Sequence, residues 1–415
     1  MGLALVASAV GINQASGASR PIEVRLGHPT FWAGAYDARG SHDHVYSLKV
    51  LGDADLLRVG IDAPSRTNWY RIEVYRPTGS LALRFHKRYG FSAEGIVKRP
   101  QPGEWKLVVS SRHVTDSVFR MRAALQDSPR TLSPRSLLPD LRAIPPFDFT
   151  FTAPQDGAGS DYDNDPDPDL ATPMSCARDE ITDDHVVRCL RFSAGIEDAG
   201  AGPLDLRFDP SDDDMRMFQL IHDTDGSVRK RRAGRFEWHD SHKHFHYRNV
   251  WTLKLLEVTD RSKGAMSSAS TGRKSGFCPA DQRIADWHRF DQAPAYSYSG
   301  NCGVTYAETG TGDFEPVPKK HHGTMAFSPG WGDVYGWYRP GNYLDFGLNV
   351  DGLYVVRVKV DQEGHVQEER EGNNTSYALI RSSGNEISVL ERGRGTDPWD
   401  PNKVVVEDWW RGRKP

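Results

Sequence analysis

The chain has 415 residues, 38% of them hydrophobic and 26% charged, so it is long enough for two or three ordinary domains and too polar to be embedded in a membrane. Its formal net charge of −4 and its pI near 6.4 leave no overall basic field that would attract nucleic acid or an anionic membrane. The chain has 39 glycines and 26 prolines, and its apolar residues fall in short alternating runs, which favours strands joined by turns over a helical bundle. We therefore expect a mainly β fold with no nucleic-acid partner and no membrane span.

Residues 1–21 contain an apolar run followed by small residues, the pattern of a signal peptide and its cleavage region. The run is too short to span a bilayer. No basic residue precedes it, so the alternatives are a truncated start and a flexible N-terminal arm. The pattern predicts a secreted, extracellular protein.

Residues 22–126 are predicted to form a small antiparallel β-sandwich, because strand-like runs alternate with turn signals such as Pro-Thr-Gly at 77–79. The segments DADLLRVGI and PQPGEWKLVV resemble the accessory β-sandwich appended to secreted bacterial peptidases. That resemblance implies a supporting or surface-attaching role, since no catalytic constellation occurs there. The predicted strands are 22–26, 44–50, 56–62, 70–77, 81–87, 104–111 and 118–125.

Residues 127–147 are rich in Pro, Ser and Arg without periodicity, which predicts a linker. The strand pattern returns in a second, β-rich domain over residues 148–395, followed by a C-terminal tail at 396–415. Long polar loops at 155–173 and 291–326 are predicted to cover a functional site.

Four cysteines are predicted to form two disulfides, Cys176 with Cys189 and Cys278 with Cys302, because export favours oxidation and these pairs need the shortest closures. Four free thiols are the alternative. The chain has no Cys-x-x-Cys spacing, which disfavours a thiolate zinc site.

The segment WHDSHKHFHY at 238–247 carries the strongest chemical signal. On a strand, the period of two places His242, His244 and His246 on one face, where three imidazoles suit copper or zinc. Without a carboxylate or thiolate in the alternation, Cu²⁺ with nitrogen ligands and water is well accommodated. His239 has the opposite parity and is predicted to be a supporting or structural group. The alternative without a function is an exposed, histidine-rich strand that binds no metal.

The histidine segment resembles the copper-binding signature of the lysyl oxidase family. Further segments that resemble this family follow in the same order, from residue 137 to residue 374: LLPDLRAIPP, CLRFSAGIEDAGAGPLDL, GRKSGFC, SPGWGDVYGWY, YLD, GLYVVRV and REGNN. The ordered set is more specific than any one motif. The resemblance implies a β-rich lysyl oxidase-like catalytic domain with long covering loops.

The resemblance assigns Lys274 and Tyr335 as the precursors of a lysyl tyrosylquinone cofactor, with the three histidines of the alternation as copper ligands. It implies oxidative deamination of primary amines, including lysine side chains of proteins, by molecular oxygen. The products are aldehydes, ammonia and hydrogen peroxide. A general base must accept the α-proton of the amine, and the candidates Asp333, Asp345 and His322 remain open.

The family also carries a structural calcium site, and the matching oxygen donors here are Asp140, the Leu141 carbonyl, Glu368, Asn373 and Asn374. Arg370 stands where the family has an aspartate, and Glu369 and Glu371 are alternative ligands. The acidic run DYDNDPDPD at 161–169 lacks the glycine and distal glutamate of an EF-hand loop and is predicted to be a solvated turn.

The competing hypothesis is a secreted copper- or zinc-binding protein without quinone chemistry, either a binding module or a hydrolase that uses metal-bound water. A zinc hydrolase needs a carboxylate base at the open position, and the chain has no HExxH-like placement. A scaffold protein with an inactive enzyme-like domain is a third possibility.

Overall fold

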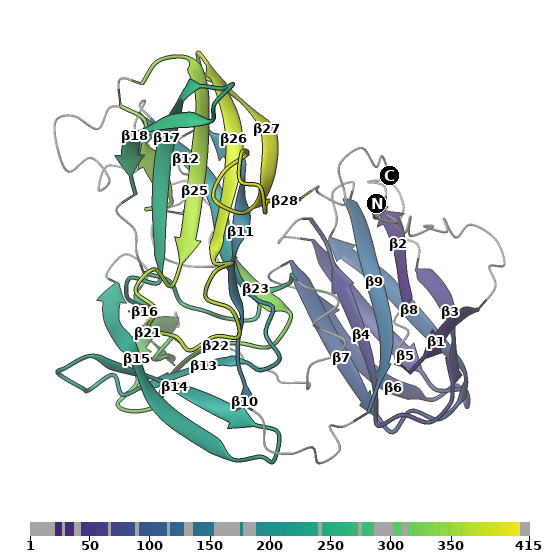
Figure 1. Ribbon diagram of the computed structural model, residues 1–415. Helices are drawn as coiled ribbons and strands as arrows, with labels where there is room; N and C mark the ends of the chain where they lie inside the picture. The colour runs from purple at the N-terminus through teal and green to yellow at the C-terminus, as the bar shows by residue number, and fades with distance from the viewer. Residues whose placement is uncertain are drawn as a thin grey trace, which may run out of the picture. The chain divides into compact units, whose positions relative to one another are not determined.

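The chain folds into two compact units in the computed structural model (Figure 1). Unit 1 comprises residues 1–130, 282–284 and 409–415, and unit 2 comprises residues 131–281 and 285–408. All regular structure of the described residues is strand, which confirms the predicted mainly β fold. Among these residues no helix is long and apolar enough to cross a membrane. The structure describes residues 21–26, 30–36, 43–64, 68–87, 91–113, 117–127, 136–152, 175–176, 188–239, 243–272, 276–285, 302–308, 314–339, 341–347 and 349–406.

Unit 1 is a sandwich of two sheets, with strand orders β1-β3-β8-β5-β6 and β2-β9-β4-β7. Alternating side chains of both sheets fill its core, which includes Leu48, Ile72, Trp105 and Phe119. All pairs are antiparallel except β1 with β3, which run parallel. The strands are β1 (Ile22–Arg25), β2 (Thr30–Tyr36), β3 (His44–Leu51), β4 (Leu56–Asp62), β5 (Trp69–Tyr75), β6 (Leu81–Lys87), β7 (Ser92–Lys98), β8 (Gly103–His113) and β9 (Ser117–Gln126), and the short β19 (Arg283–Ile284) belongs to this unit.

Two strands of unit 1, β2 and β7, lie where the sequence pattern predicted none. Each carries a central glycine beneath an aromatic side chain. A Cβ on Gly34 would lie 2.3 Å from the Phe119 ring, and one on Gly95 would lie 2.6 Å from the Phe85 ring. Glycine weakens the strand signal in the sequence, although the packing of the sandwich requires it at these positions.

Unit 2 contains three larger sheets and one two-stranded sheet. Their orders are β16-β15-β14-β13-β22 with β10 beside β14, β11-β12-β23 with β24 beside β12, β18-β17-β25-β26-β27-β28, and β20-β21. One cluster of buried apolar side chains includes Phe236, Tyr247, Trp251 and Tyr335. The strands are β10 (Ser136–Leu137), β11 (Leu141–Thr150), β12 (Cys189–Asp198), β13 (Leu204–Phe208), β14 (Arg216–Asp223), β15 (Val228–His239), β16 (His244–Tyr247), β17 (Trp251–Asp260), β18 (Ala265–Thr271), β20 (Val304–Glu308), β21 (Phe314–Pro318), β22 (Gly323–Phe327), β23 (Trp331–Tyr335), β24 (Tyr343–Asp345), β25 (Gly352–Val360), β26 (Thr375–Ser383), β27 (Glu386–Arg394) and β28 (Val404–Val405).

The predicted linker at 127–147 is wrong in its second half, which forms β10 and most of β11. Leu141 is fully buried, and β11 pairs with β12. The register shifts between Ile144 and Phe147, where two prolines cannot donate ladder hydrogen bonds. The prolines that suggested a linker therefore mark an irregularity inside a core strand.

Two further segments predicted to be irregular contain strands. The predicted loop at 291–326 includes β20, β21 and most of β22, and the predicted tail at 396–415 includes β28, which pairs with β27. Residues 1–20 and the whole predicted loop at 155–173, with its acidic run at 161–169, lie outside the described residues.

Both predicted disulfides are confirmed. Cys176 is bonded to Cys189, and Cys278 is bonded to Cys302. Two disulfides are consistent with an extracellular protein.

Candidate metal centre

The histidine segment is an antiparallel pair rather than one continuous strand. β15 runs to His239, and β16 returns from His244, with His239 opposite His244 and Glu237 opposite His246. Residues that face each other in an antiparallel pair project to the same side. The reversal therefore brings His239 to the face that carries His244 and His246.

The imidazoles of this face converge. Nε2 of His246 lies 3.2 Å from Nε2 of His244, and the His239 ring centroid lies 4.6 Å from that of His246. His246 is fully buried and His244 partly buried. Nitrogen atoms this close suit a shared transition-metal ion, so the donor set fits copper or zinc. His242, the third predicted ligand, lies outside the described residues.

The predicted role of His239 rested on its parity in an unbroken strand, and the chain reversal removes that basis. Lys243 has a φ of 53°, and its amide donates to the His239 carbonyl over 2.8 Å, as in a tight turn. The turn-forming pair Asp240 and Ser241 in the sequence was the signal that could have indicated this reversal.

A short segment from Gly276 to Cys278 packs against the same strand. Phe277 exchanges backbone hydrogen bonds with Tyr247, of 2.8 and 3.1 Å. A Cβ on Gly276 would lie 3.0 Å from Nδ1 of His246, so only glycine allows this approach without displacement. Lys274 lies two positions earlier in the sequence and is outside the described residues.

The Cys278–Cys302 disulfide lies beside the histidines. A nitrogen of His244 and the two sulfur atoms lie within 4.8 Å of one another. Because both sulfurs are joined in a disulfide, they are not thiolate ligands. The Cys302 carbonyl accepts a 3.0 Å hydrogen bond from the Phe245 amide, so this disulfide links Gly276–Cys278 to β16.

Tyr335, at the end of β23, lies in the buried core next to the histidines. Its ring centroid is 6.2 Å from that of His246 and stacks on Phe277 at 4.3 Å. Its hydroxyl accepts a 3.1 Å hydrogen bond from the Cys278 amide. The Arg339 guanidinium lies over the ring, 5.2 Å from its centroid.

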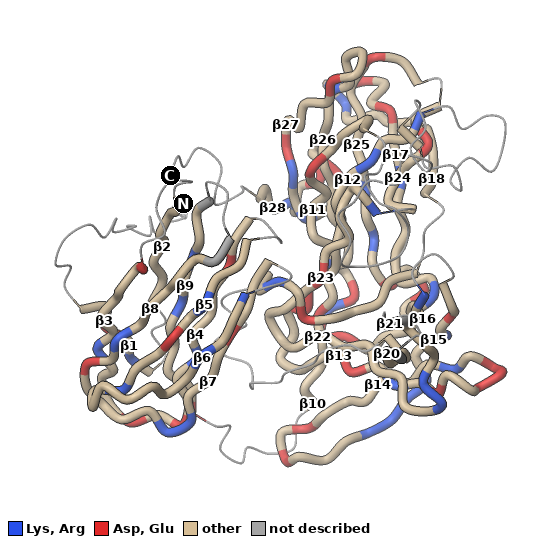
Figure 2. Tube along the Cα trace, turned by 180° about the vertical axis from the view of Figure 1, so that it is seen from behind, with Lys and Arg blue, Asp and Glu red and all other residues tan. Residues whose placement is uncertain are grey.

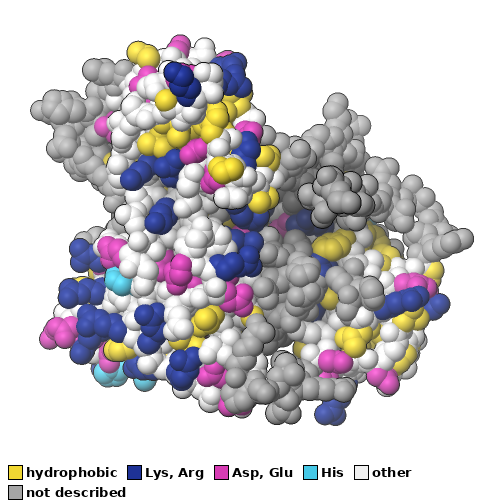
Figure 3. Space-filling view, in the orientation of Figure 1, with side chains coloured by type: hydrophobic (Ala, Val, Ile, Leu, Met, Phe, Trp, Pro, Cys, Tyr) yellow, Lys and Arg dark blue, Asp and Glu magenta, His cyan; other side chains and the backbone are white. Residues whose placement is uncertain are grey.

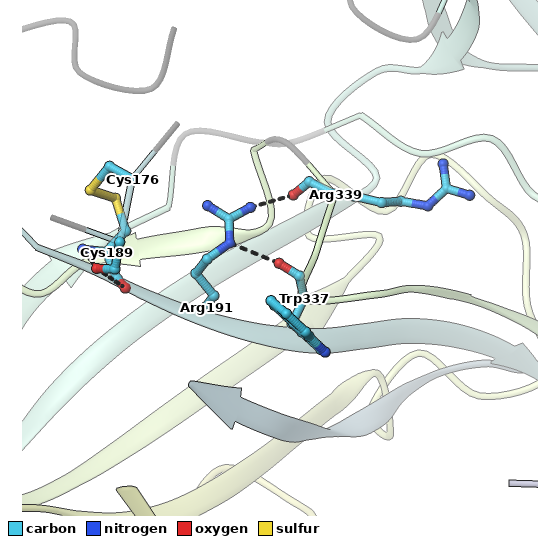
Figure 4. Close-up of a disulfide and its surroundings, with 6 residues drawn as sticks. Cys176, Cys189, Arg191, Trp337 and Arg339 are labelled. Carbon is cyan, nitrogen blue, oxygen red and sulfur yellow. Dashed lines mark hydrogen bonds between the residues drawn. A yellow bond between two sulfur atoms is a disulfide. The ribbon is translucent and has the colours of Figure 1, made fainter. Parts of the chain in front are cut away.

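The turn after Tyr335 is tied to β12. Figure 4 shows the side chain of Arg191 directed at two carbonyls of this turn, with Nε donating to Trp337 over 2.8 Å and Nη2 to Arg339 over 2.6 Å. Asn342 Nδ2 also donates to the Tyr335 carbonyl over 2.7 Å. These bonds fix the backbone that carries Tyr335 and Arg339.

The three candidate bases lie in different surroundings. Asp333 is fully buried two residues before Tyr335 on β23, so the two side chains share one face of the strand. Asp345 pairs with Cys189, five residues along β12 from Ala194, the partner of Tyr335. His322 is exposed in the turn before β22.

Four of the five predicted calcium ligands meet in two side-chain pairs in unit 2, and the amide of the fifth residue, Leu141, contacts one of them. Asn373 Nδ2 donates to Asp140 Oδ1, and Asn374 Nδ2 donates to Glu368 Oε1, each over 2.8 Å. The Leu141 amide donates to Glu368 Oε2 over 2.5 Å. In the part of the chain that the structure describes, Oδ1 of both asparagines is buried without a hydrogen-bond donor.

Buried carboxylates and one arginine determine how well this cluster would accept a cation. Burial raises the pKa of Glu368 to about 9. Arg370 Nη2 lies 3.5 Å from Asp140 Oδ2 and partly neutralises that carboxylate. Glu369 is engaged elsewhere, accepting from the Ala201 amide, whereas Glu371 has a carboxylate oxygen within 4.8 Å of those of Asp361 and Glu368. The oxygens fit a hard cation, although Arg370 opposes its charge.

Comparison with known proteins gives no relative for this site. No family model and no curated protein matches the chain. Among solved structures, it is similar to the propeptide form of the lipase BlEst2 of Bacillus licheniformis, at 12% sequence identity and a TM-score of 0.19, over 63% of this chain and 46% of that one. The chain thus spans about half the length of that lipase, and a likeness this low carries no argument about fold or function.

Proposed function

We propose that this protein is a secreted, copper- and quinone-dependent amine oxidase of the lysyl oxidase type. It would convert primary amines, including the lysine side chains of proteins, to aldehydes with release of ammonia and hydrogen peroxide. The ordered motifs of the sequence and one structural observation support this function. The Tyr335 ring lies 6.2 Å from His246, whose Nε2 is 3.2 Å from that of His244.

His242, His244 and His246 would hold the copper, and His239 lies opposite His244 on the facing strand. Copper with oxygen would supply the oxidation of the Tyr335 ring, and the quinone completed by Lys274 would supply the electron sink for amine oxidation. The protein's own task is to hold the ring, keep water away and move protons.

Several contacts suit Tyr335 to that task. Phe277 covers one ring face, and Trp251 approaches edge-on with centroids 6.1 Å apart, so bulk water is excluded from the ring. The Cys278 amide donates to the phenol oxygen, which would stabilise negative charge there. Arg339 adds a fixed cation over the ring.

Asp333 is our candidate for the general base. It shares a strand face with Tyr335, and its Oδ1 accepts a 2.7 Å hydrogen bond from the Val334 amide, which orients the carboxylate. A buried carboxylate on the strand face that carries Tyr335 could take a proton from a substrate carbon without solvent competition.

Quinone staining of the denatured, copper-loaded protein, combined with peptide mass spectrometry, tests the proposal. We expect wild type to stain and to yield a cross-linked peptide containing Lys274 and Tyr335. Lys274→Ala and Tyr335→Phe should each lose staining and amine-dependent peroxide while retaining copper. Full peroxide production by either variant would refute the quinone mechanism. Copper binding by wild type without staining would instead support the metal-binding protein without quinone chemistry.

We also propose a structural calcium ion at the Asp140 cluster, supported by the buried carbonyl oxygens of Asn373 and Asn374. Asp140, Glu368 and the Leu141 carbonyl would complete its oxygen ligands. A rise in the melting temperature with added CaCl₂, reversed by a chelator, would support this ion. An unchanged melting temperature would exclude it at the concentrations tested.

A further inference from the structure

A pocket of about 410 Å³ lies on unit 2. It is at the end of the β15–β16 pair that is opposite the turn joining the two strands. Its lining includes Arg231, Arg232, Arg235 and Arg248, against one carboxylate, that of Glu363. Figure 3 shows basic side chains gathered over the part of the unit where Figure 1 labels β15. In Figure 2, which traces the backbone from behind, Lys and Arg positions are blue along the same strands. This concentration of positive charge contrasts with the net charge of −4 of the whole chain.

A β-bulge creates this arrangement. Arg235 pairs with Arg216, and Arg232 pairs with Phe218. The two β15 residues are three positions apart while their β14 partners are two apart, so β15 contains one extra residue. The extra residue places Arg232 and Arg235, which would otherwise face opposite ways, on the same exposed side. Gly234 has a φ of 81° in this bulge, and a Cβ there would lie 2.9 Å from the His365 ring.

The arginines are only partly neutralised. Among the described residues, Arg232 and Arg235 have no carboxylate within ion-pair distance. Arg248 lies 3.5 Å from Glu237 with half its side chain exposed, and Arg231 donates to the His365 carbonyl over 3.3 Å. Glu363 is shared with Asn249 at 3.2 Å and His365 at 3.5 Å. Guanidinium groups stay charged at every physiological pH, so an anionic ligand would relieve their mutual repulsion.

We propose that this pocket binds an acidic peptide segment, rich in Asp or Glu, of the protein whose lysine is oxidised. The inference rests on the proposed function and adds a substrate class to it. Arg235 is four residues from His239 on β15, about 13 Å along a strand. An acidic residue within about four positions of the reacting lysine can span that separation. Carboxylates match the planar guanidinium fork, and the pocket has room for more than one side chain.

Binding is tested without turnover. The probe is a fluorescein-labelled peptide with norleucine in place of lysine, flanked by four glutamates, compared with the same peptide carrying glutamines. We expect the full-length wild type to bind the glutamate peptide at least about tenfold more tightly than the glutamine peptide, with affinity falling as salt rises. The Arg232→Gln/Arg235→Gln variant should lose this preference. The matched control is Arg261→Gln/Arg381→Gln, which neutralises exposed arginines elsewhere on unit 2 and should keep it.

Equal affinity of wild type and the Arg232/Arg235 variant for the glutamate peptide would overturn the proposal. So would binding of a heparin oligosaccharide without binding of the peptide, since the partner would then be a sulfated polymer. A second measurement compares kcat/KM for the two peptides with lysine restored. Oxidation of both peptides without preference would leave the amine oxidase in place and remove the pocket's role. Peptide binding at the arginines without any peroxide would instead retain an acidic-peptide site and refute the oxidase.

Discussion

Replacing Gly276 with alanine would test whether the approach of residues 276–278 sets the position of His246. The new Cβ would lie 2.9 Å from Glu237 Oε1 and 3.0 Å from both Cβ and Nδ1 of His246. The segment cannot simply move away, because Phe277 exchanges backbone hydrogen bonds with Tyr247 and Cys278 is in a disulfide. Overpacking of this kind costs about 1–3 kcal/mol.

The metal-free protein can relieve part of this strain by rotating His246, whereas a copper-bound imidazole cannot rotate freely. If the strain falls on the copper-bound state, copper affinity should drop by about 5- to 150-fold. A competition titration with a chelator of known affinity measures this change, with thermal unfolding of the metal-free protein in parallel. Gly352→Ala is the control, because its Cβ would meet Tyr354 at an ordinary 3.7 Å. Unchanged copper affinity and melting temperature in Gly276→Ala would refute the packing argument.

Four further changes probe separate features. Asp333→Asn should lower kcat by about 100- to 10,000-fold with quinone staining retained, and a kcat near wild type would remove Asp333 as the base. Replacing both Cys278 and Cys302 with alanine should lower the free energy of unfolding, measured in urea, by about 3.5 kcal/mol, the value for a loop of this length; no change would show that the link adds nothing to stability. Arg370→Asp should add a ligand and remove a cation, so the shift in melting temperature produced by calcium should grow; a smaller shift would contradict the cluster geometry. Burial lowers the pKa of His44, so the folded state binds a proton less readily than the unfolded state, and unit 1 should lose stability as pH falls below about 6.5. His44→Phe keeps the aromatic packing and should flatten this part of the melting-temperature profile relative to wild type, whereas an unchanged profile would assign the pH dependence to other groups.

The sequence by itself predicted those features whose physical signal is local. Alternation of apolar and polar residues identified strands such as β3 and β5, because one face of each is buried in the sandwich. Loop closure is cheapest for the shortest separations, which was sufficient to pair Cys176 with Cys189 and Cys278 with Cys302. Local composition gave wrong predictions where tertiary packing explains the residue type. The prolines of β11 suggested a linker, and the glycines of β2 and β7 hid two strands.

The tertiary structure alone decided which side chains meet. Parity along one strand separates His239 from His244, yet the reversal between β15 and β16 places them opposite each other. Tyr335 lies 89 positions beyond His246, and only the packing of unit 2 brings their rings 6.2 Å apart. The basic pocket likewise depends on a one-residue bulge at Gly234, which a sequence pattern of period two cannot register. Periodicity fixes the faces of a single strand, whereas turns, bulges and the pairing of distant strands determine which of those faces come together.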